Sequence, residues 1–313
     1  MNCQVIWTLN GGLGNQIFQY LASLHIQDKL GITNIKYCTS DYIQKGYRDL
    51  DIDRLVSINV SSQSLDSRSF ANRCKRKISR LAYSSLIIHN SWLSRYLLPD
   101  MACLDESLFQ DNSSASLQGL CMFMKGYASS SKTFCVEGYW QNPSPYLDGL
   151  CRWRSLFKSS AAFVPEEWSD VAYLSIHIRR GDYLNPTGYD FFFSRFHPVQ
   201  YLQHALQLIP SEFQHLPVLV VTDDQSWANY YMSLLLKGKK FYVSSSEDPL
   251  VDWSILANST FSIIGNSTFS LTAAMLNFKS YRQRYRVIMP QWINAKESSI
   301  SKNWDMLPGS IIV

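Results

Sequence analysis

The sequence predicts an α/β protein with two domains, and two observations carry this prediction. In the second half of the chain, short apolar runs alternate with longer amphipathic stretches. Continuous apolar strands separated by helices are typical of a parallel sheet that is covered on both faces. In addition, 313 residues with 46% hydrophobic content are enough to bury two substantial cores. We expect domains at 1–165 and 166–313, because Pro165 separates a helical stretch from the next apolar run.

The expected elements of the second half follow one another as strand and helix in turn. They are strands at 171–176, 218–221, 241–243 and 261–264, and helices at 198–209, 225–236, 249–257 and 269–276. The first half alternates less regularly, and its serine-rich piece 59–69 and polar segment 110–116 are expected to be surface loops. Since ligands bind at strand ends in open α/β sheets, we expect the second half to bind a nucleotide.

The most informative motif follows the strand expected at 171–176. It reads His177-Ile178-Arg179-Arg180-Gly181-Asp182-Tyr183 and places two adjacent arginines at a strand end. Guanidinium groups offer planar forks that match phosphate oxygens, which lysine does not. The ligand expected here is therefore a diphosphate. On this motif alone, a surface ion network between the arginines and the aspartate is an equally open interpretation.

A glycine-rich turn near the N-terminus lies between an apolar run at 5–7 and a helical stretch at 17–30. It reads Gly11-Gly12-Leu13-Gly14-Asn15-Gln16. Glycines let the backbone approach an anion closely, and the first amides of a helix present the positive end of its dipole. The spacing differs from the dinucleotide fingerprint G-x-G-x-x-G. We interpret the turn as a cradle for a sugar diphosphate.

A third segment, Gly265-Asn266-Ser267-Thr268-Phe269-Ser270, again lies between an expected strand and an expected helix. Two interpretations are equally open for its hydroxyl groups. Ser267 and Thr268 either cap the helix that follows or bind phosphate through hydroxyl and amide together.

Charge and composition exclude several classes of partner. The formal net charge is +4, the sequence pI is about 8.6, and no basic tract is long enough to predict nucleic-acid binding. The basic cluster at 73–80 is interpreted as a solvated helix face, with contact to anionic lipid headgroups as the alternative. No run approaches the roughly 20 apolar residues of a spanning helix. The expected location is cytoplasmic, with peripheral contact at the inner membrane face left open.

Together with Thr222-Asp223-Asp224 and the segment 137–141, these motifs resemble glycosyltransferase family 11, the α-1,2-fucosyltransferases. The resemblance begins at Gly11 and extends to about Leu276. It implies a GT-B-like fold, in which two Rossmann-like domains face a cleft. It also implies inverting transfer of L-fucose from GDP-β-L-fucose to the 2-hydroxyl of a galactose-containing acceptor, in glycan or surface-polysaccharide synthesis. The alternatives are a fucosyltransferase of another linkage (α-1,6 or protein-O) and a non-catalytic GDP-sugar-binding protein.

The resemblance also implies roles for individual residues. Arg179 or Arg180 holds the β-phosphate, and His177 touches the ribose or phosphate region. Asp182 either orients the arginines or accepts the proton of the attacking hydroxyl. Asp252 is expected to accept hydrogen bonds from N1-H and N2-H of guanine, and helix N-capping or a surface charge is the equally open alternative. The residues expected to bind the donor are Gly12, Gly14, Asn15, Gln16, Asp223, Asp252, Asn266, Ser267, Thr268 and Phe269.

Two groups of aspartates have further expectations attached to them. Asp223 and Asp224 end a strand, and the family pattern implies that one of them braces the arginine pair. The run Asp49-Leu50-Asp51-Ile52-Asp53 contains the D-x-D pattern that binds manganese in other transferases. In this family the segment resembles a loop instead. We expect no metal and no other cofactor, because the arginines supply the charge that a metal ion would bring.

Overall fold

The computed structural model describes most of the two halves of the chain, and all structural statements below refer to the described residues. These are 3–39, 43, 45–46, 49–58, 60, 101–109, 115–126, 132–157, 160–181, 197–277, 286–290, 307 and 309–313.

The chain divides into two compact units, Met1–Gly149 and Leu150–Val313. This division falls earlier than the boundary expected near Pro165. The segment between the two positions packs within the second unit, where the ring of Phe157 stacks on Trp253 with centroids 6.3 Å apart. A change of local pattern at a proline therefore marks an element boundary inside the second unit, while tertiary packing sets the limit of the unit.

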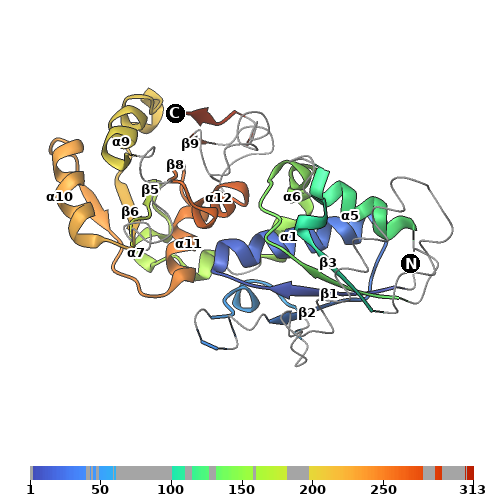
Figure 1. Cartoon of the computed structure of the whole chain (residues 1–313). Helices are drawn as coiled ribbons and strands as arrows, with labels where there is room; N and C mark the ends of the chain where they lie inside the picture. Colours follow the sequence, from blue (N-terminus) through green and yellow to red (C-terminus); the bar gives the residue numbers. More distant parts are fainter. Residues whose placement is uncertain are drawn as a thin grey trace. The chain divides into compact units, whose positions relative to one another are not determined.

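The first unit is built around a parallel sheet whose four described strands have the order β2-β1-β4-β3. The strands are β1 (Gln4–Leu9), β2 (Ile35–Thr39), β3 (Met101–Asp105) and β4 (Thr133–Glu137). Helices α1 (Leu13–Leu30) and α5 (Ala115–Gly126) lie on one face of this sheet (Figure 1). Because all the strands are parallel, the segments that follow β1 and β4 leave the sheet at the same edge.

Helix α1 begins four residues earlier than the sequence pattern predicts. Gly11 has φ 77°, in the left-handed region that favours glycine, and it turns the chain out of β1. The amides of Asn15 and Gln16 then both donate to the carbonyl of Gly12, at 2.9 and 3.1 Å. Helical hydrogen bonding therefore starts at Gly12, and Gly14 to Gln16 lie in the first turn of the helix.

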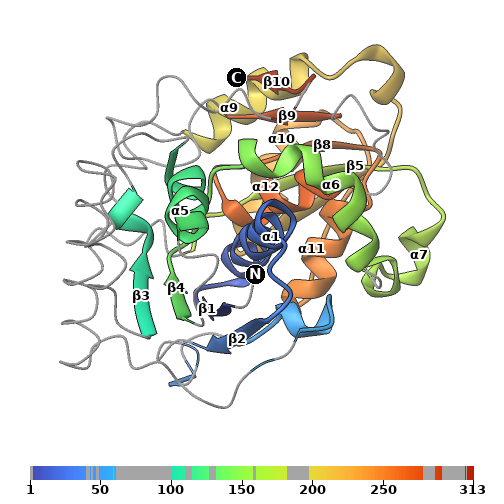
Figure 2. The same ribbon diagram turned by 90° about the vertical axis from the view of Figure 1, so that its right-hand side faces the viewer.

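The second unit contains a parallel sheet whose six described strands have the order β10-β9-β8-β5-β6-β7. The strands are β5 (Leu174–Ile178), β6 (Val218–Thr222), β7 (Phe241–Val243), β8 (Phe261–Ile263), β9 (Val287–Met289) and β10 (Ile311–Ile312). Figure 2 shows β10, β9, β8 and β5 side by side in this order. The chain runs outward from β5 through β6 to β7 and then returns to β8 on the other side of β5. The direction of winding therefore reverses between β5 and β8, which is the switch point of a doubly wound sheet.

Helices cover both faces of this second sheet, as Figure 1 shows. Helices α9 (Pro198–Gln207) and α10 (Gln225–Leu235) lie on one face, and α11 (Pro249–Ala257) and α12 (Thr268–Met275) lie on the other. Leu174, Ile176 and Ile178 share one buried cluster with residues of α9 and α10. Because side chains alternate along a strand, His177 points to the opposite face, on the side of α11 and α12.

The predicted fold class is confirmed, since both units are α/β and both sheets are parallel. The largest shift among the expected elements of the second unit is in its first strand, which begins at Leu174 instead of Val171. The first ladder hydrogen bond is donated by the amide of Leu174 to Pro217, at 2.9 Å, and Val171 is 37% exposed. Strands β9 and β10 were missed, because they are short and lie beyond residue 276, outside the alternation of strand and helix from which the other strands were predicted.

Candidate functional site

The carboxyl ends of β5, β6 and β8 bring together the main motifs of the second half. β5 lies between β6 and β8, and all three strands are parallel. Residues 177–181 therefore meet residues 222–224 on one side and residues 264–269 on the other. This edge of the sheet, at the switch point, is where open α/β sheets bind ligands.

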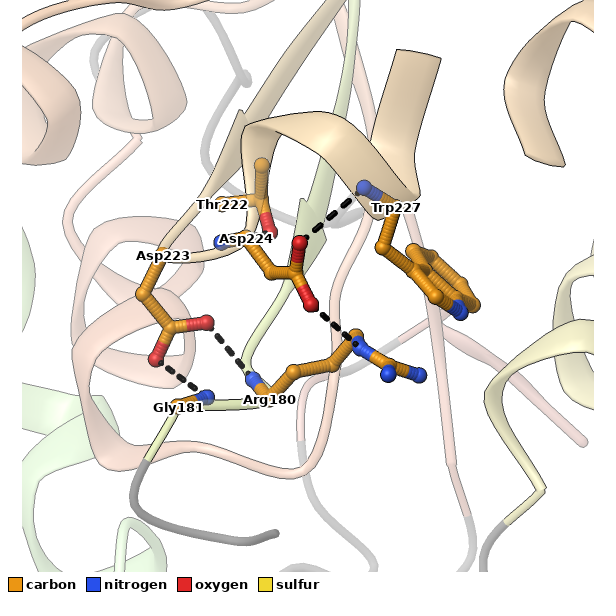
Figure 3. A network of polar contacts seen from close by, with 6 residues as sticks. All are labelled: Arg180, Gly181, Thr222, Asp223, Asp224 and Trp227. Atoms are coloured by element: carbon orange, nitrogen blue, oxygen red, sulfur yellow. Dashed lines mark hydrogen bonds and ion pairs between the residues drawn. The ribbon is translucent and has the colours of Figure 1, made fainter. Parts of the chain in front are cut away.

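The turn after β5 is held by the carboxylate of Asp223. Its Oδ1 accepts from the amide of Arg180 at 2.6 Å, and its Oδ2 accepts from the amide of Gly181 at 3.0 Å (Figure 3). A Cβ atom at position 181 would lie 2.8 Å from Asp223 Oδ2, so a larger residue here would displace the carboxylate that holds the turn. Asp223 thus fixes the main chain that carries the arginines.

The guanidinium group of Arg180 is held by two residues at the start of α10. Its Nε donates to Asp224 Oδ2 at 3.1 Å, and its Cζ lies 4.4 Å from the ring centroid of Trp227. Asp224 is itself oriented, because its Oδ1 caps α10 by accepting from the amide of Trp227 at 3.0 Å. The terminal nitrogens of Arg180 point away from Asp224 (Figure 3). The fork is therefore fixed in direction, with N–H donors that extend beyond its ion pair.

His177 is a buried and neutral side chain. Its ring is 5% exposed and lies 5.6 Å from the ring of Phe269, between centroids. Burial, and secondly the charge of Arg179, lowers the pKa of His177 to about 3. Its Nδ1 is buried and has no hydrogen-bond partner among the residues that the structure describes. At neutral pH this ring is a hydrogen-bonding group and contributes no positive charge.

Gly265 allows the end of β8 to approach the end of β5. A Cβ atom at this position would lie 2.8 Å from the carbonyl oxygen of His177, which is a backbone atom and has little freedom to move. The next residues begin α12, where Ser267 is the N-cap and its hydroxyl accepts from the amide of Phe269 at 3.3 Å. The capping interpretation therefore holds for Ser267. Asn266 and Ser267 are buried and Thr268 is half-buried.

Asp252 lies in the first turn of α11, which follows the carboxyl end of β7. Its Oδ1 accepts from the hydroxyl of Ser244 at 2.6 Å. Burial raises the pKa of Asp252 to about 6, the charge of Asp248 adds to this effect, and the hydrogen bond from Ser244 opposes it. A carboxylate kept partly out of water in this way gains by meeting hydrogen-bond donors.

In the first unit, Gln16 joins the glycine turn to the segment at 49–52. Its side chain is fully buried, and its Nε2 donates to the carbonyls of Gly11 at 2.9 Å and Asp49 at 2.8 Å. Its Oε1 accepts from the amides of Asp51 at 3.0 Å and Ile52 at 3.1 Å. These four bonds use both N–H groups and both lone pairs of the side-chain amide. Gln16 therefore supports the turn, and its side chain has no group left for a ligand.

Two further amide side chains, those of Gln19 and Asn15, connect the glycine turn to the segment after β4. Gln19 donates to the carbonyl of Gly138 at 2.9 Å and accepts from the amide of Asn10 at 2.9 Å. The side chain of Asn15 accepts from Gln141 Nε2 at 2.8 Å. The ends of β1 and β4 thus form one hydrogen-bonded assembly, and local sequence patterns give no sign of it.

The described residues show no group of three or more His, Cys, Asp or Glu side chains placed to hold a metal ion. In the D-x-D segment, Asp49 and Asp53 are exposed, and Asp51 belongs to the turn that Gln16 holds. None of the described helices has the length and apolar composition needed to cross a membrane. Asp182, the basic cluster at 73–80 and most of the loop at 59–69 lie outside the described residues.

A doubly wound sheet with two arginines at its switch point is suited to binding a phosphorylated ligand. The chain belongs to glycosyl transferase family 11, whose family model matches residues 106–307. The expected family is thereby confirmed, and the protein is a glycosyltransferase.

Two relatives from Escherichia coli match along most of their length. The O-antigen biosynthesis glycosyltransferase WbnK is 26% identical over 283 residues, which cover 81% of this chain and 86% of the relative. An alpha-1,2-colitosyltransferase is 24% identical over 281 residues, which cover 82% of this chain and 85% of the relative. Among solved structures, a mutant of Arabidopsis thaliana FUT1 in complex with GDP matches with a TM-score of 0.49 and 13% identity, over 88% of this chain and 69% of that one.

Proposed function

We propose that the protein transfers L-fucose from GDP-β-L-fucose to the 2-hydroxyl of a galactoside, with inversion and without a metal ion. The observation that carries this proposal is the fixed orientation of the Arg180 guanidinium group at the switch point of the doubly wound sheet. Membership of family 11 and the names of the two E. coli relatives support the class of reaction.

The proposed step breaks the bond between C1 of fucose and the β-phosphate oxygen, and the electron pair leaves with the phosphate. A bond forms between C1 and the acceptor O2, whose proton passes to a base. Negative charge grows on the β-phosphate, so cationic donors fixed in advance lower the barrier. Arg179 and Arg180 are the proposed donors. Asp224 and Trp227 spare Arg180 the cost of reorienting during the reaction.

The identity of the base is narrowed by the state of His177. A ring whose pKa is lowered to about 3 is a poor proton acceptor at neutral pH. His177 is therefore proposed to hydrogen-bond the donor. Two roles were considered for Asp182. Because His177 is a poor proton acceptor, we propose that Asp182 accepts the proton of the attacking hydroxyl.

Recognition of guanine is assigned to Asp252. Its carboxylate accepts from N1-H and N2-H, a donor pair that adenine does not present at this edge. Ser244 holds one oxygen of the carboxylate at 2.6 Å and so orients the group. In the first unit, Gly12, Gly14 and Asn15 remain proposed contacts of the donor. A Cβ at Gly12 would meet nothing within 4 Å, which leaves open space beside the start of α1.

We expect affinity for GDP-fucose to fall as pH drops through about 6. The folded pKa of Asp252, about 6, lies above the ordinary value of 3.8, so the carboxylate is protonated below about pH 6 and loses one acceptor for guanine. Calorimetric titration with GDP-fucose between pH 5 and 8 measures this midpoint, because its diphosphate is esterified at both ends and does not titrate in this range, whereas the terminal phosphate of GDP has its own pKa of about 6. Asp252→Asn should weaken binding and abolish this pH dependence.

Two further variants sharpen the pH experiment. Ser244→Ala removes the hydrogen bond that lowers the pKa, so the midpoint should move to higher pH. Glu247→Gln changes an exposed carboxylate in the same loop and should leave the midpoint where it is. A midpoint that is unchanged in Asp252→Asn would refute the assignment.

The acceptor and the exact donor sugar are separate parts of the proposal. One relative is named for O-antigen biosynthesis, so a galactoside of a bacterial surface polysaccharide is the acceptor class we propose. The other is named a colitosyltransferase. Colitose is 3-deoxy-L-fucose, and a donor that lacks the 3-hydroxyl is therefore the second candidate. Competition between GDP-fucose and its 3-deoxy analogue for one acceptor separates the two.

The experiment that tests the proposal is transfer from GDP-fucose to lactose in excess chelator, with the linkage determined by NMR. An α-1,2-linked product formed without added metal is the expected result. An α-1,6-linked product would contradict the proposed α-1,2 linkage. A requirement for manganese would contradict the proposed metal-independent mechanism. Tight GDP binding without product on a broad panel of galactosides would favour a non-catalytic sugar-nucleotide-binding protein.

A further inference from the structure

The solvent face of α10 differs from the usual polar face of a surface helix. Its exposed positions form one stripe along the helix and comprise Gln225, Ser226, Asn229, Tyr230, Ser233, Leu234 and, just beyond the helix, Lys237. Tyr230 is 62% exposed and Leu234 is 55% exposed. Two large apolar side chains therefore stand in solvent one turn apart.

The surroundings of these two side chains carry no negative charge along the chain. No Asp or Glu occurs from Gln225 to Ser246. A helix face that is simply solvated usually carries charged residues of both signs. Helix α10 itself carries no charged residue, and the charged residues that directly follow it, Lys237, Lys239 and Lys240, are positive.

Aromatic contacts hold the exposed tyrosine in place. The rings of Tyr230 and Tyr231 meet edge to face with centroids 5.0 Å apart. Tyr231 in turn lies 4.7 Å from Trp227, the residue that stacks on Arg180. Tyr230 is thus an ordered projection at the end of a row of rings, and it loses little freedom if it becomes buried against a partner.

Lysines directly follow this exposed stripe of α10. Lys237 and Lys240 are exposed, and Lys240 Nζ lies 4.9 Å from the ring centroid of Tyr242, which is 37% exposed. Lys239 Nζ donates to the carbonyl of Gln214 and is committed to the fold. The exposed face therefore combines two large apolar side chains, set among uncharged polar ones, with a basic end, which is the charge arrangement that anionic membranes attract.

We propose that the α10 ridge, formed by Tyr230, Leu234, Lys237 and Lys240, docks on an anionic phospholipid surface. The tyrosine and leucine enter the headgroup boundary, and the two ammonium groups meet lipid phosphates. The basic charge favours this occupant over a neutral glycan or an apolar protein face. Since α10 has 11 residues, it places Asp224 about 16 Å from the basic end. The ridge is independent of the identity of the sugar donor.

Flotation of the full chain with vesicles tests this proposal. Vesicles of phosphatidylcholine alone are compared with vesicles in which phosphatidylglycerol replaces part of it, at low and high salt. We expect binding to the anionic vesicles at low salt and its loss at high salt, because screening weakens the attraction between the lysines and the lipids. Equal binding to both vesicles, or binding to neither, would overturn the proposal.

Matched variants locate the surface. Lys237→Gln with Lys240→Gln should lower the partition coefficient about 30-fold, since each lysine near an anionic surface contributes roughly a factor of five. Tyr230→Ser with Leu234→Ser should also reduce binding. The control is Met122→Ser with Lys125→Gln, which removes an exposed apolar and an exposed basic residue from α5 in the first unit.

Binding that persists in both α10 variants would place the membrane contact elsewhere and reject the ridge. A loss that is equal in the α5 control would reject it as well. Activity toward a soluble acceptor should stay unchanged in the α10 double variants, because none of the four residues contacts the arginine site.

Discussion

Replacement of Arg180 by alanine is expected to lower kcat for fucosyl transfer by about 100- to 1,000-fold, as the loss of one fixed donor to a developing oxyanion does elsewhere. The KM for GDP-fucose should change much less. The guanidinium group acts mainly on charge that develops as the glycosidic bond breaks, so its loss raises the barrier more than it weakens ground-state binding. Steady-state kinetics with GDP-fucose and lactose measure both quantities.

Arg180→Lys should not restore the rate. An ammonium group has no Nε to donate to Asp224 and no planar face to lie 4.4 Å from Trp227. The matched control is Arg286→Ala. Arg286 also stacks on an aromatic ring, Phe213, with Cζ 5.3 Å from the centroid, but it precedes β9 at the amino edge of the sheet. Full activity in Arg180→Ala, or equal losses in both variants, would refute the role of the fork.

Substitution of Gln16 by leucine should destabilise the protein by about 3–5 kcal/mol, since leucine fills a similar volume but leaves four backbone groups without their partner. These groups are the carbonyls of Gly11 and Asp49 and the amides at positions 51 and 52. A fully buried group that loses its bond costs about 1–3 kcal/mol, and the three groups whose bonds are only partly buried cost less, because water reaches them. Urea denaturation followed by circular dichroism measures the change.

The same substitution at Gln27 provides the control on the same helix. Gln27 is exposed, so Gln27→Leu should change the free energy of unfolding by no more than about 0.5 kcal/mol. If Gln16→Leu were as stable as Gln27→Leu, Gln16 would not support the turn, and a direct role in binding the donor would have to be considered again.

The sequence predicted the central strands of the second sheet well because they are buried on both faces. Every residue of β5 and β6 is buried, and β6 reads as the apolar run Val218 to Val221, whereas β5 carries Ser175 and His177 between its apolar residues. The polar residues that follow such a run must lie at the carboxyl edge. This is why the position of the arginine motif could be inferred without a structure.

The wiring of the site could not be inferred in this way. The partners of Gln16 at 49, 51 and 52 are 33 to 36 residues away, and Trp227 is far from Arg180 in the chain. No local period reports such contacts. The neutral state of His177 depends on burial by several elements, which the motif itself does not contain. The sequence therefore identifies which residues can form hydrogen bonds. It does not show whether each of them bonds to a ligand or to the protein backbone.

The carboxylate of Asp223 accepts hydrogen bonds from the backbone amides of residues 180 and 181. The bend after β5 therefore does not depend on which side chain position 180 carries. The scaffold and the reactive group are thereby separated: a side chain at position 181 would displace the Asp223 carboxylate, whereas position 180 is able to change without refolding the loop. A protein built in this manner can lose or alter its chemistry by a single substitution and keep its architecture. Among enzymes with this bend, we expect the aspartate and glycine that correspond to Asp223 and Gly181 to be retained while the residue at position 180 varies.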